Sequence, residues 1–530
     1  MANEKEYVVV VNRGIDLEEF DAELSATTGS GPIPNRAVEV ANPRWGSKRM
    51  THWMLTDEEA KTLETDDRVL AVEIPAEKRD DIEIGLNASQ TGIWYRGSSV
   101  DNTHVNWGLR RCIEESNIFA SDTTLTGDYT YPLDGTGVDF IVQDSGIQPD
   151  HPEFQDANGV TRVQQIDWYT ASGLSGTQDP NFYTDYDGHG THCAGIAVGK
   201  TFGWAKNARV YSQKLAGLEG TGDPNAGISQ ADAFDAIRLW HASKSGADAG
   251  RPTVVNMSWG YGLTRTGDPT SGIYRGTAWT YGVDYTDRNA LEAATGVTIN
   301  RLASGLAGRI AIRVASIDAE IEDMIDAGIH ICIAAGNGYN KVDIATGDDY
   351  DNEVTWGGLT RNYHRGSSPY SLNAFMVANI SSTVTSPGNL DKPRESSTRG
   401  PGCNIWAPGT HIMSACSNDF DTGKFSPVNY NDGDSTYKQM SISGTSMAAP
   451  QVAGLCCLYL QVFPDLKPAE LLKKITQTDA KAVVYSSGSD NDYDAYGLST
   501  WGQNTNMLYS KYNNSQIFTL SGPHTISIGT

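Results

Sequence analysis

An aspartate, a histidine and a serine lie in three short segments whose composition suits nucleophilic catalysis. Asp144 lies in Val-Gln-Asp-Ser-Gly, His189 in Gly-His-Gly-Thr-His-Cys, and Ser446 in Gly-Thr-Ser-Met-Ala-Ala-Pro. Attack on a peptide carbonyl needs a hydroxyl, an imidazole that takes its proton, and a carboxylate that orients the imidazole. We therefore expect the three side chains to meet as one catalytic triad.

The flanking residues predict the elements that hold this triad. The apolar run 138–142 predicts a buried parallel strand that delivers Asp144 at its carboxyl end, where open α/β sheets place their sites. Small residues after His189 predict a closely packed helix that starts at the imidazole. A second helix is expected to start at Ser446, with Pro450 in its first turn.

Strands and helices alternate between these segments, as in a doubly wound α/β fold with a mainly parallel sheet and helices on both faces. The expected strands are 209–215, 253–257, 329–335 and 375–380, and the expected helices are 230–244 and 312–327. His192 lies one helical turn after His189, so we expect it to pack or hydrogen-bond rather than to act as the base.

At these residues the chain resembles the subtilisin-like serine proteases, in which acid, base and nucleophile follow in the same order. Further segments that resemble family motifs are 151–154 (HPEF), 256–260 (NMSWG), 334–338 (AAGNG), 406–409 (WAPG) and 444–450 (GTSMAAP). The likeness runs from about Trp107 to about Asn514. It is greatest to the proteinase K branch, because Cys193 matches a buried thiol under the histidine and 502–509 matches the C-terminal end. The resemblance implies a serine endopeptidase whose chemistry needs no cofactor.

The same resemblance implies roles for further residues. Asn337 would donate its side-chain amide to the oxyanion together with the Ser446 main-chain N–H, and losing such a donor costs about 100- to 1000-fold in turnover. Two segments would hold the substrate as an extended strand, because glycines there let a peptide backbone approach. Trp259 would favour apolar or aromatic substrate side chains, with a core aromatic as the alternative. The implied substrate-binding residues are Gly220, Thr221, Gly222, Ser258, Trp259, Gly260, Ala334, Ala335 and Gly336.

Residues 1–75 predict a separate small domain. Strands at 7–11, 37–41, 51–55 and 69–74 and helices at 16–24 and 56–65 follow the order βαββαβ of a ferredoxin-like α+β sandwich. Thr56 and Glu59 predict a capping box at the second helix. The domain resembles the inhibitory propeptide of the same family, and a permanent partner-binding module is the alternative.

This interpretation divides the rest of the chain in two. The polar stretch 76–106 is expected to be a linker that the enzyme cleaves itself, and 107–530 to be the catalytic domain. Segments near 261–308 and 339–365 depart from the family pattern as insertions. The second segment is acidic, with Asp343, Asp348, Asp349, Asp351 and Glu353. It is expected to be a solvated loop, with a calcium site or a preference for basic substrate side chains as the alternatives.

Structural calcium is considered because relatives often bind it through carboxylate oxygens. Asp179, Asp185 and Asp187 could form such a group, although Asp187 could instead fix the loop that carries His189. A position where proteinase K-like enzymes carry a calcium-ligating aspartate is Asn404 here. No metal ligand is therefore assigned.

Length and composition bound the remaining alternatives. The 530 residues fit one small module plus one large domain, and a net charge of −25 argues against nucleic acid as a partner. Seven scattered cysteines indicate reduced thiols, and neither a signal peptide nor a membrane-spanning run is visible. We therefore expect a cytoplasmic enzyme or one packaged in a phage or virion, with other routes of secretion left open. Proteins or peptides are the expected substrates. The alternatives are a narrowly specific processing protease and a non-enzymatic scaffold.

Overall fold

The computed structural model describes most of the chain. The described residues are 4–26, 31–34, 36–44, 47–75, 83–86, 106–115, 117, 131, 133–178, 183–218, 227–299, 307–384, 390–430, 434–486, 500–510, 518–520 and 526–528. Within them the helices are α1 Leu17–Ser25, α2 Asp57–Leu63, α3 Trp107–Arg111, α4 Trp168–Ser172, α5 His189–Val198, α6 Gln230–Ser243, α7 Arg288–Thr295, α8 Ala315–Asp326, α9 Thr445–Val462 and α10 Pro468–Lys473, with short turns η3 Pro152–Phe154, η4 Gly246–Asp248 and η5 Lys474–Asp479.

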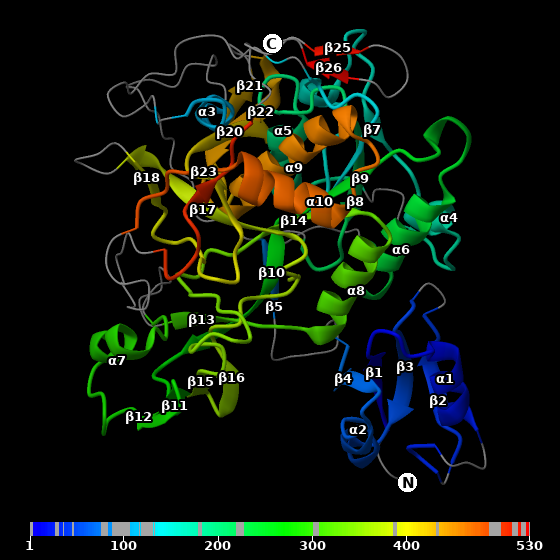
Figure 1. The fold of residues 1–530 in the computed structure, drawn as a ribbon, viewed down its shortest axis with the longest axis vertical. Coiled ribbons are helices and arrows are strands. Elements are labelled where there is room, and N and C mark those ends of the chain that lie inside the picture. Colours follow the sequence, from blue (N-terminus) through cyan, green and yellow to red (C-terminus); the bar gives the residue numbers. More distant parts are fainter. Residues whose placement is uncertain are drawn as a thin grey trace.

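A large, mainly parallel sheet forms the centre of the part of the chain that follows residue 106 (Figure 1). Its strand order is β23-β24-β19-β17-β14-β9-β6-β8-β7, with β18 paired to β17. The strands are β6 Asp139–Asp144, β7 Val163–Gln164, β8 Arg209–Lys214, β9 Thr253–Met257, β14 His330–Ala334, β17 Phe375–Val384, β18 Asp391–Pro393, β19 Ile405–Pro408, β23 Lys481–Ala482 and β24 Asn506–Met507. The predicted α/β class is confirmed.

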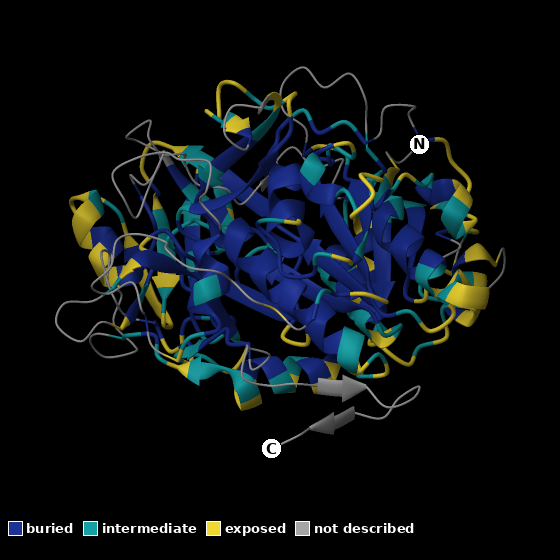
Figure 2. Cartoon of the chain, turned by 90° about the horizontal axis from the view of Figure 1, so that it is seen from above, coloured by how far each residue is buried: buried dark blue, intermediate teal, exposed yellow. Residues whose placement is uncertain are grey.

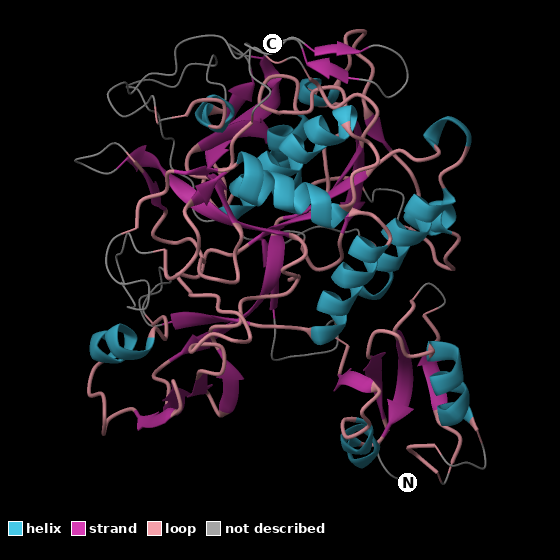
Figure 3. Ribbon diagram, in the orientation of Figure 1, coloured by secondary structure: helices cyan, strands magenta, loops and turns pink. Residues whose placement is uncertain are grey.

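Burial on both faces explains the apolar runs within the central strands. Every residue of β6 is buried, and Phe140, Ile141 and Val142 have no exposed surface. Helices pack on both faces of the sheet, with α5 against α9 and α6 against α8, so neither face of a central strand meets water (Figures 2 and 3). The predicted strands and helices of this region are confirmed to within a few residues at their ends.

The N-terminal region folds in the predicted element order. Its strands are β1 Lys5–Val11, β2 Glu39–Asn42, β3 Met50–Leu55 and β4 Val69–Glu73, arranged in the antiparallel order β2-β3-β1-β4. The helices α1 and α2 cover one face over a core that includes Val9, Phe20, Trp53 and Leu63. Thr56 and Glu59 form the expected capping box at the start of α2.

The segments predicted to be insertions contribute strands to two further sheets. β10 Trp259–Thr266 lies between β13 Ala307–Ala311 and β5 Glu83–Leu86, and both neighbours are antiparallel to it. A second sheet has the order β12-β11-β15-β16, formed by β11 Ser271–Tyr274, β12 Thr277–Thr280, β15 Glu353–Trp356 and β16 Leu359–Asn362. Segments almost 80 residues apart in sequence therefore share one sheet, at the lower left of Figure 1.

The expectation of a solvated acidic loop at 339–365 is wrong. Asp349 is buried, and its carboxylate accepts hydrogen bonds from Arg275 (2.7 Å) and Lys341 (2.7 Å). Asp343 is buried as well and accepts from the main-chain N–H groups of Ile344 and Asp349. Asp343 and Asp349 are thus internal, whereas Asp348 and Asp351 are exposed. Asp349 finds its partner Arg275 about 70 residues earlier in the chain, which the local composition around Asp349 does not reveal.

The remaining described elements complete the molecule. A three-stranded antiparallel sheet has the order β20-β22-β21, with β20 Ile412–Cys416, β21 Val428–Tyr430 and β22 Asp434–Ile442, and a pair is formed by β25 Phe518–Leu520 and β26 Ile526–Ile528. All seven cysteines are free and buried. Across the described residues, no helix combines the length and hydropathy needed to cross a membrane.

Candidate active site

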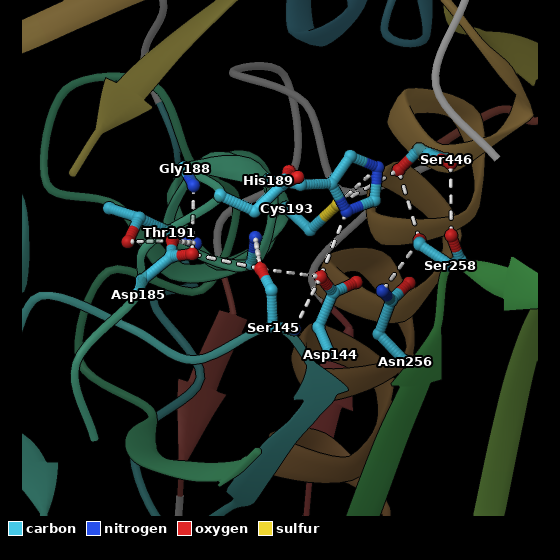
Figure 4. Close-up of polar contacts among 12 residues, drawn as sticks. Asp144, Ser145, Asp185, Gly188, His189, Thr191, Cys193, Asn256, Ser258 and Ser446 are labelled. Atoms are coloured by element: carbon cyan, nitrogen blue, oxygen red, sulfur yellow. Dashed lines mark hydrogen bonds and ion pairs between the residues drawn. The ribbon is translucent and has the colours of Figure 1, made fainter. Parts of the chain in front are cut away.

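Asp144 and His189 meet at the carboxyl edge of the central sheet. Asp144 is the last residue of β6 and His189 the first of α5, and Asp144 Oδ1 lies 2.9 Å from His189 Nδ1 (Figure 4). Both side chains have no exposed surface. The start of α5 comes close to the end of β6 because Gly190 has no side chain: a Cβ there would overlap the Gly146 carbonyl oxygen.

Ser446 lies in the first turn of α9 and is tied to Ser258. The Ser446 hydroxyl donates to the Ser258 carbonyl oxygen (3.1 Å), and the Ser258 hydroxyl donates to the Ser446 carbonyl oxygen (3.1 Å). The Cys193 thiol lies 3.9 Å from His189 Nε2 and 3.4 Å from the Ser446 carbonyl oxygen, so it joins the imidazole to the serine. These contacts bring the three predicted triad segments into one buried cluster.

Pro450 explains why the Ser446 carbonyl oxygen is available to these neighbours. In an α-helix this oxygen would accept from the N–H of residue 450, and proline has none. The sequence predicts Pro450 in the first turn of this helix, but the helix starts at Thr445 and Pro450 lies in its second turn. The Ser446 carbonyl oxygen instead accepts hydrogen bonds from the Ser258 hydroxyl and the Cys193 thiol.

The electrostatics of the cluster favour a proton on the imidazole. Burial opposes the charged form of His189, but the Asp144 carboxylate and Cys193 outweigh it and raise the pKa of His189 well above its usual value. Burial also raises the pKa of the Cys193 thiol. The aspartate therefore orients the ring through Nδ1 and stabilises the imidazolium that forms when Nε2 takes a proton.

Asp185 supports the loop that carries the histidine. Its carboxylate accepts from the Ser145 hydroxyl (2.8 Å) and from the main-chain N–H groups of Gly188 (2.8 Å) and Thr191 (2.8 Å). The Ser145 hydroxyl in turn accepts from the Gly190 N–H (3.0 Å). The sequence singled out Asp185 only as a calcium candidate, because a contact with Ser145, 40 residues earlier, carries no local signal.

The other calcium candidates are also engaged by protein groups or lie elsewhere. Asp187 is buried and pairs with Lys424, and burial raises its pKa to about 6 although Lys424 and His189 act in the opposite direction. Asn404 fixes a loop through the Met376 N–H (3.0 Å) and the Ala374 carbonyl oxygen (2.7 Å). Asp179 lies outside the described residues.

Asn337 stands beside the start of α9. Its side-chain oxygen accepts from the Thr445 N–H (2.9 Å) and lies 3.3 Å from the Thr445 hydroxyl. Because Thr445 holds the side-chain oxygen of Asn337, the Nδ2 group points away from Thr445. Gly336, with φ +108°, makes the turn that brings Asn337 here, and its N–H donates to the Thr445 hydroxyl (3.0 Å).

The predicted substrate-binding residues are only partly described. Ser258, Trp259 and Gly260 lie at and just before the start of β10, and Ala334 and Ala335 are buried at the end of β14. Trp259 has no exposed surface and contacts Phe234 and Tyr261 at ring-centroid distances of 6.3 and 5.8 Å. Gly220, Thr221 and Gly222 lie outside the described residues.

Comparison with known proteins agrees with this geometry. Residues 135–502 match the model of the subtilase family, a stretch that covers more than half of the chain and holds all three predicted triad residues. The chain belongs to the subtilase family. It is a subtilisin-like serine endopeptidase, and subtilases need no cofactor for catalysis.

Several relatives of this subtilase are proteases by name. It is 27% identical to the subtilisin-like serine protease Pen c 2 of Penicillium citrinum, over 76% of this chain and 66% of the relative. It is 25% identical to a cuticle-degrading serine protease of Arthrobotrys oligospora, over 75% of this chain and 69% of the relative. Among solved structures, a cold-adapted subtilisin-like serine proteinase matches with a TM-score of 0.44 and 22% identity, covering 77% of this chain and 98% of that one.

The contacts of this subtilase's His192, and those within the Asp144, His189 and Cys193 cluster, decide two remaining questions of role. His192 Nε2 contacts the carbonyl oxygens of Ile412 (3.1 Å) and Met440 (3.0 Å), which gives it the structural role expected from the sequence. Asp144, His189 and Cys193 offer three ligand atoms within 4.8 Å of one another. These atoms already contact one another, and burial keeps the proton on the thiol, so the cluster fits proton transfer better than metal binding.

Proposed function

We propose that this endopeptidase works through an acyl-enzyme formed on Ser446. The Ser446 hydroxyl turns from the Ser258 carbonyl toward His189, attacks the substrate carbonyl carbon and passes its proton to His189 Nε2. The tetrahedral intermediate then collapses: the C–N bond breaks, and the imidazolium returns its proton to the leaving amine. Water enters by the same route to release the acid. The observation that carries this proposal is the buried 2.9 Å contact between Asp144 and His189, joined to Ser446 through Cys193.

Asn337 is proposed as the side-chain donor of the oxyanion hole. The negative charge appears on the former carbonyl oxygen, next to the Ser446 main-chain N–H at the start of α9. Thr445 holds the amide oxygen of Asn337, which fixes the donor end before substrate arrives. Ala334, Ala335 and Gly336 lead into this residue and are proposed to form a wall of the first specificity pocket.

The N-terminal domain is proposed to be an intramolecular inhibitor that the enzyme removes. It is docked on the two helices α6 and α8. Glu73 accepts hydrogen bonds from the first main-chain N–H groups of α8, at Ala315 (3.3 Å) and Ser316 (2.7 Å). Arg44 is buried between the two helices, where it pairs with Asp235 (3.0 Å) on α6 and with Glu320 on α8.

The linker supports self-processing through its own strand. β5 runs antiparallel to β10 with Leu86 opposite Trp259, Gly85 opposite Gly260 and Glu83 opposite Gly262. Ser258, the residue before Trp259, is bonded to Ser446. Because β5 approaches the serine as its residue numbers rise, we propose that the enzyme cuts within two residues after Leu86. The linker predicted at 76–106 therefore holds the first substrate.

Expression of the wild-type chain and of Ser446→Ala tests this proposal. We expect the wild type to react with a fluorophosphonate probe and to yield a new N-terminus one to three residues after Leu86. Ser446→Ala should stay full length and unlabelled. A folded wild-type chain that neither takes up the probe, nor processes itself, nor digests casein would refute the proposal.

A further inference from the structure

An arginine side chain lies on the face of the substrate-binding strand, beyond the residues that the family motif covers. Arg309 belongs to β13, and its guanidinium covers Gly262 of β10. A Cβ at Gly262 would lie only 3.0 Å from Arg309 Nη2 and closer still to Nε. Glycine at this position therefore lets the guanidinium rest on the strand.

The two faces of β10 differ sharply. Trp259 and Tyr261 project on one face, where both are buried, whereas the other face carries only Gly260 and Gly262 at the corresponding positions. Register pairs Thr264 with Arg309 and Gly262 with Ala311, so Arg309 is the diagonal neighbour of Gly262 on the glycine face. The guanidinium is thus on the same face as any residue paired directly opposite Gly262.

Backbone hydrogen bonds show that Gly262 can hold such a residue. The Tyr261 N–H donates to the Ser368 carbonyl (3.1 Å), and its carbonyl accepts from the Ile312 N–H (3.1 Å), both on the side away from β5. Because adjacent residues of a strand point their polar groups to opposite sides, Gly260 and Gly262 direct theirs toward β5. A substrate strand is therefore held at both glycines.

We propose that Arg309 is a specificity-determining residue that selects a carboxylate side chain at the substrate position opposite Gly262. This inference rests on the proposed function. The chain itself has Glu83 at that position, three residues before Leu86. Arg309 is half-buried on its strand, and its planar guanidinium can donate two parallel hydrogen bonds to a carboxylate. Hydrogen bonds between two charged groups are about twice as strong as those between neutral groups.

The apolar face sets the rest of the preference. A substrate residue paired with Trp259 or Tyr261 belongs to the aromatic face of β10. The register pairs Trp259 with Leu86 and Tyr261 with Ile84. The residue between them, opposite Gly260, is Gly85. The structure thus assigns a preferred extended segment of the form acidic, apolar, small, apolar, which ends at most two residues before the cut. Such a requirement fits a processing protease better than a broad digestive one.

Peptide kinetics test the proposal on the self-processed enzyme. The substrates copy residues 80–91, with Glu, Gln or Lys at the position of Glu83. We expect kcat/KM to be about tenfold higher for Glu than for Gln, which corresponds to ~1.4 kcal/mol. Arg309→Gln should remove this preference, and Arg309→Glu should reverse it in favour of Lys. Arg265→Gln, a matched loss of charge on β10 whose side chain lies next to Gly357, should leave it intact.

Equal kcat/KM for the Glu and Gln peptides on the wild type, with normal cleavage of both, would overturn the role of Arg309 and leave the proposed function standing. Failure to cleave any peptide, together with no fluorophosphonate labelling, would instead refute the proposed function.

A second measurement needs no catalysis. In the full Ser446→Ala chain, hydrogen exchange of the amides of residues 83–86 reports how tightly β5 is held. We expect Glu83→Gln and Arg309→Gln each to speed this exchange about fivefold, and the double variant to be no faster than either. Exchange that is unchanged in the single variants, or additive in the double variant, would show that Arg309 does not act on this position.

Discussion

The buried arginine of the N-terminal domain should decide how firmly this domain stays docked. Arg44 has only 4% of its side chain exposed, and Asp235 and Glu320 have 2% each. Replacing Arg44 by methionine keeps most of the volume and removes the cation. In this variant Asp235 still pairs with Arg238 at 2.6 Å, so Glu320 is the carboxylate that loses its cationic partner. Breaking one partner from a buried pair costs about 3–5 kcal/mol, which corresponds to at least ~100-fold in the docking equilibrium.

Two amides of α8 provide the assay. The N–H groups of Ala315 and Ser316 are bonded to Glu73 only while the domain is docked, so their hydrogen exchange in the Ser446→Ala chain reports undocking. The matched control is Arg13→Met, because the half-exposed Arg13 pairs with Glu322 and Asp326 on the same helix. Such pairs contribute about 0.2–1 kcal/mol. Equal, small effects of the two variants would refute the reasoning.

The pH dependence of this variant follows from Glu320. Burial and Asp235 raise its pKa to about 8 in the docked state, against the effect of Arg44. A carboxyl whose pKa is raised on docking favours the docked state when it is protonated. Arg44→Met removes a group that opposes this rise, so the pKa of Glu320 is higher still in the docked variant. Docking of Arg44→Met should therefore recover as the pH is lowered and Glu320 takes up a proton.

Three further predictions concern catalysis and the insertions. Asn337→Ala should lower kcat about 100- to 1000-fold with little change in KM, measured with a peptide ester, and an unchanged kcat would remove Asn337 from the oxyanion hole. Activity should be lost as the pH falls through the raised pKa of His189, so the acid midpoint of kcat/KM should lie above 6.5, and full activity at pH 5 would contradict its role as base. Burial opposes ionisation of Asp349, but Arg275 and Lys341 outweigh it and lower the pKa of Asp349. The ionised Asp349 therefore stabilises the folded protein, and this contribution should be lost only as the pH falls through the depressed pKa. Asp349→Asn should lower the free energy of unfolding by about 3–5 kcal/mol in urea, against at most ~1 kcal/mol for the exposed Asp351→Asn, and similar losses would contradict the buried cluster.

The parts of the structure that follow local rules could be predicted from the sequence. The strand that ends at Asp144, the helix that starts at His189 and the capping box at Thr56 each leave a signal in neighbouring residues. The meeting of Asp144 with His189 was predicted from the chemistry of a triad, in which a carboxylate orients the imidazole, and sheet topology places only Asp144 at the carboxyl edge.

Other features depend on residues far apart and left no local signal. The acidic run at 343–353 looks like a solvated loop until Arg275, about 70 residues earlier, is placed against Asp349. The strand at 83–86 lies in a polar stretch and exists because β10 offers it an open edge. Arg309 and Gly262 acquire their relation only through the pairing of β10 with β13.

Mass-spectrometric mapping of the fluorophosphonate adduct tests the central claim most directly. The account predicts one adduct, on Ser446, that is lost in His189→Ala and Asp144→Ala at the same probe concentration. An adduct on another serine, or undiminished labelling of Ser446 in both variants, would contradict the claim that these three side chains form one reactive group.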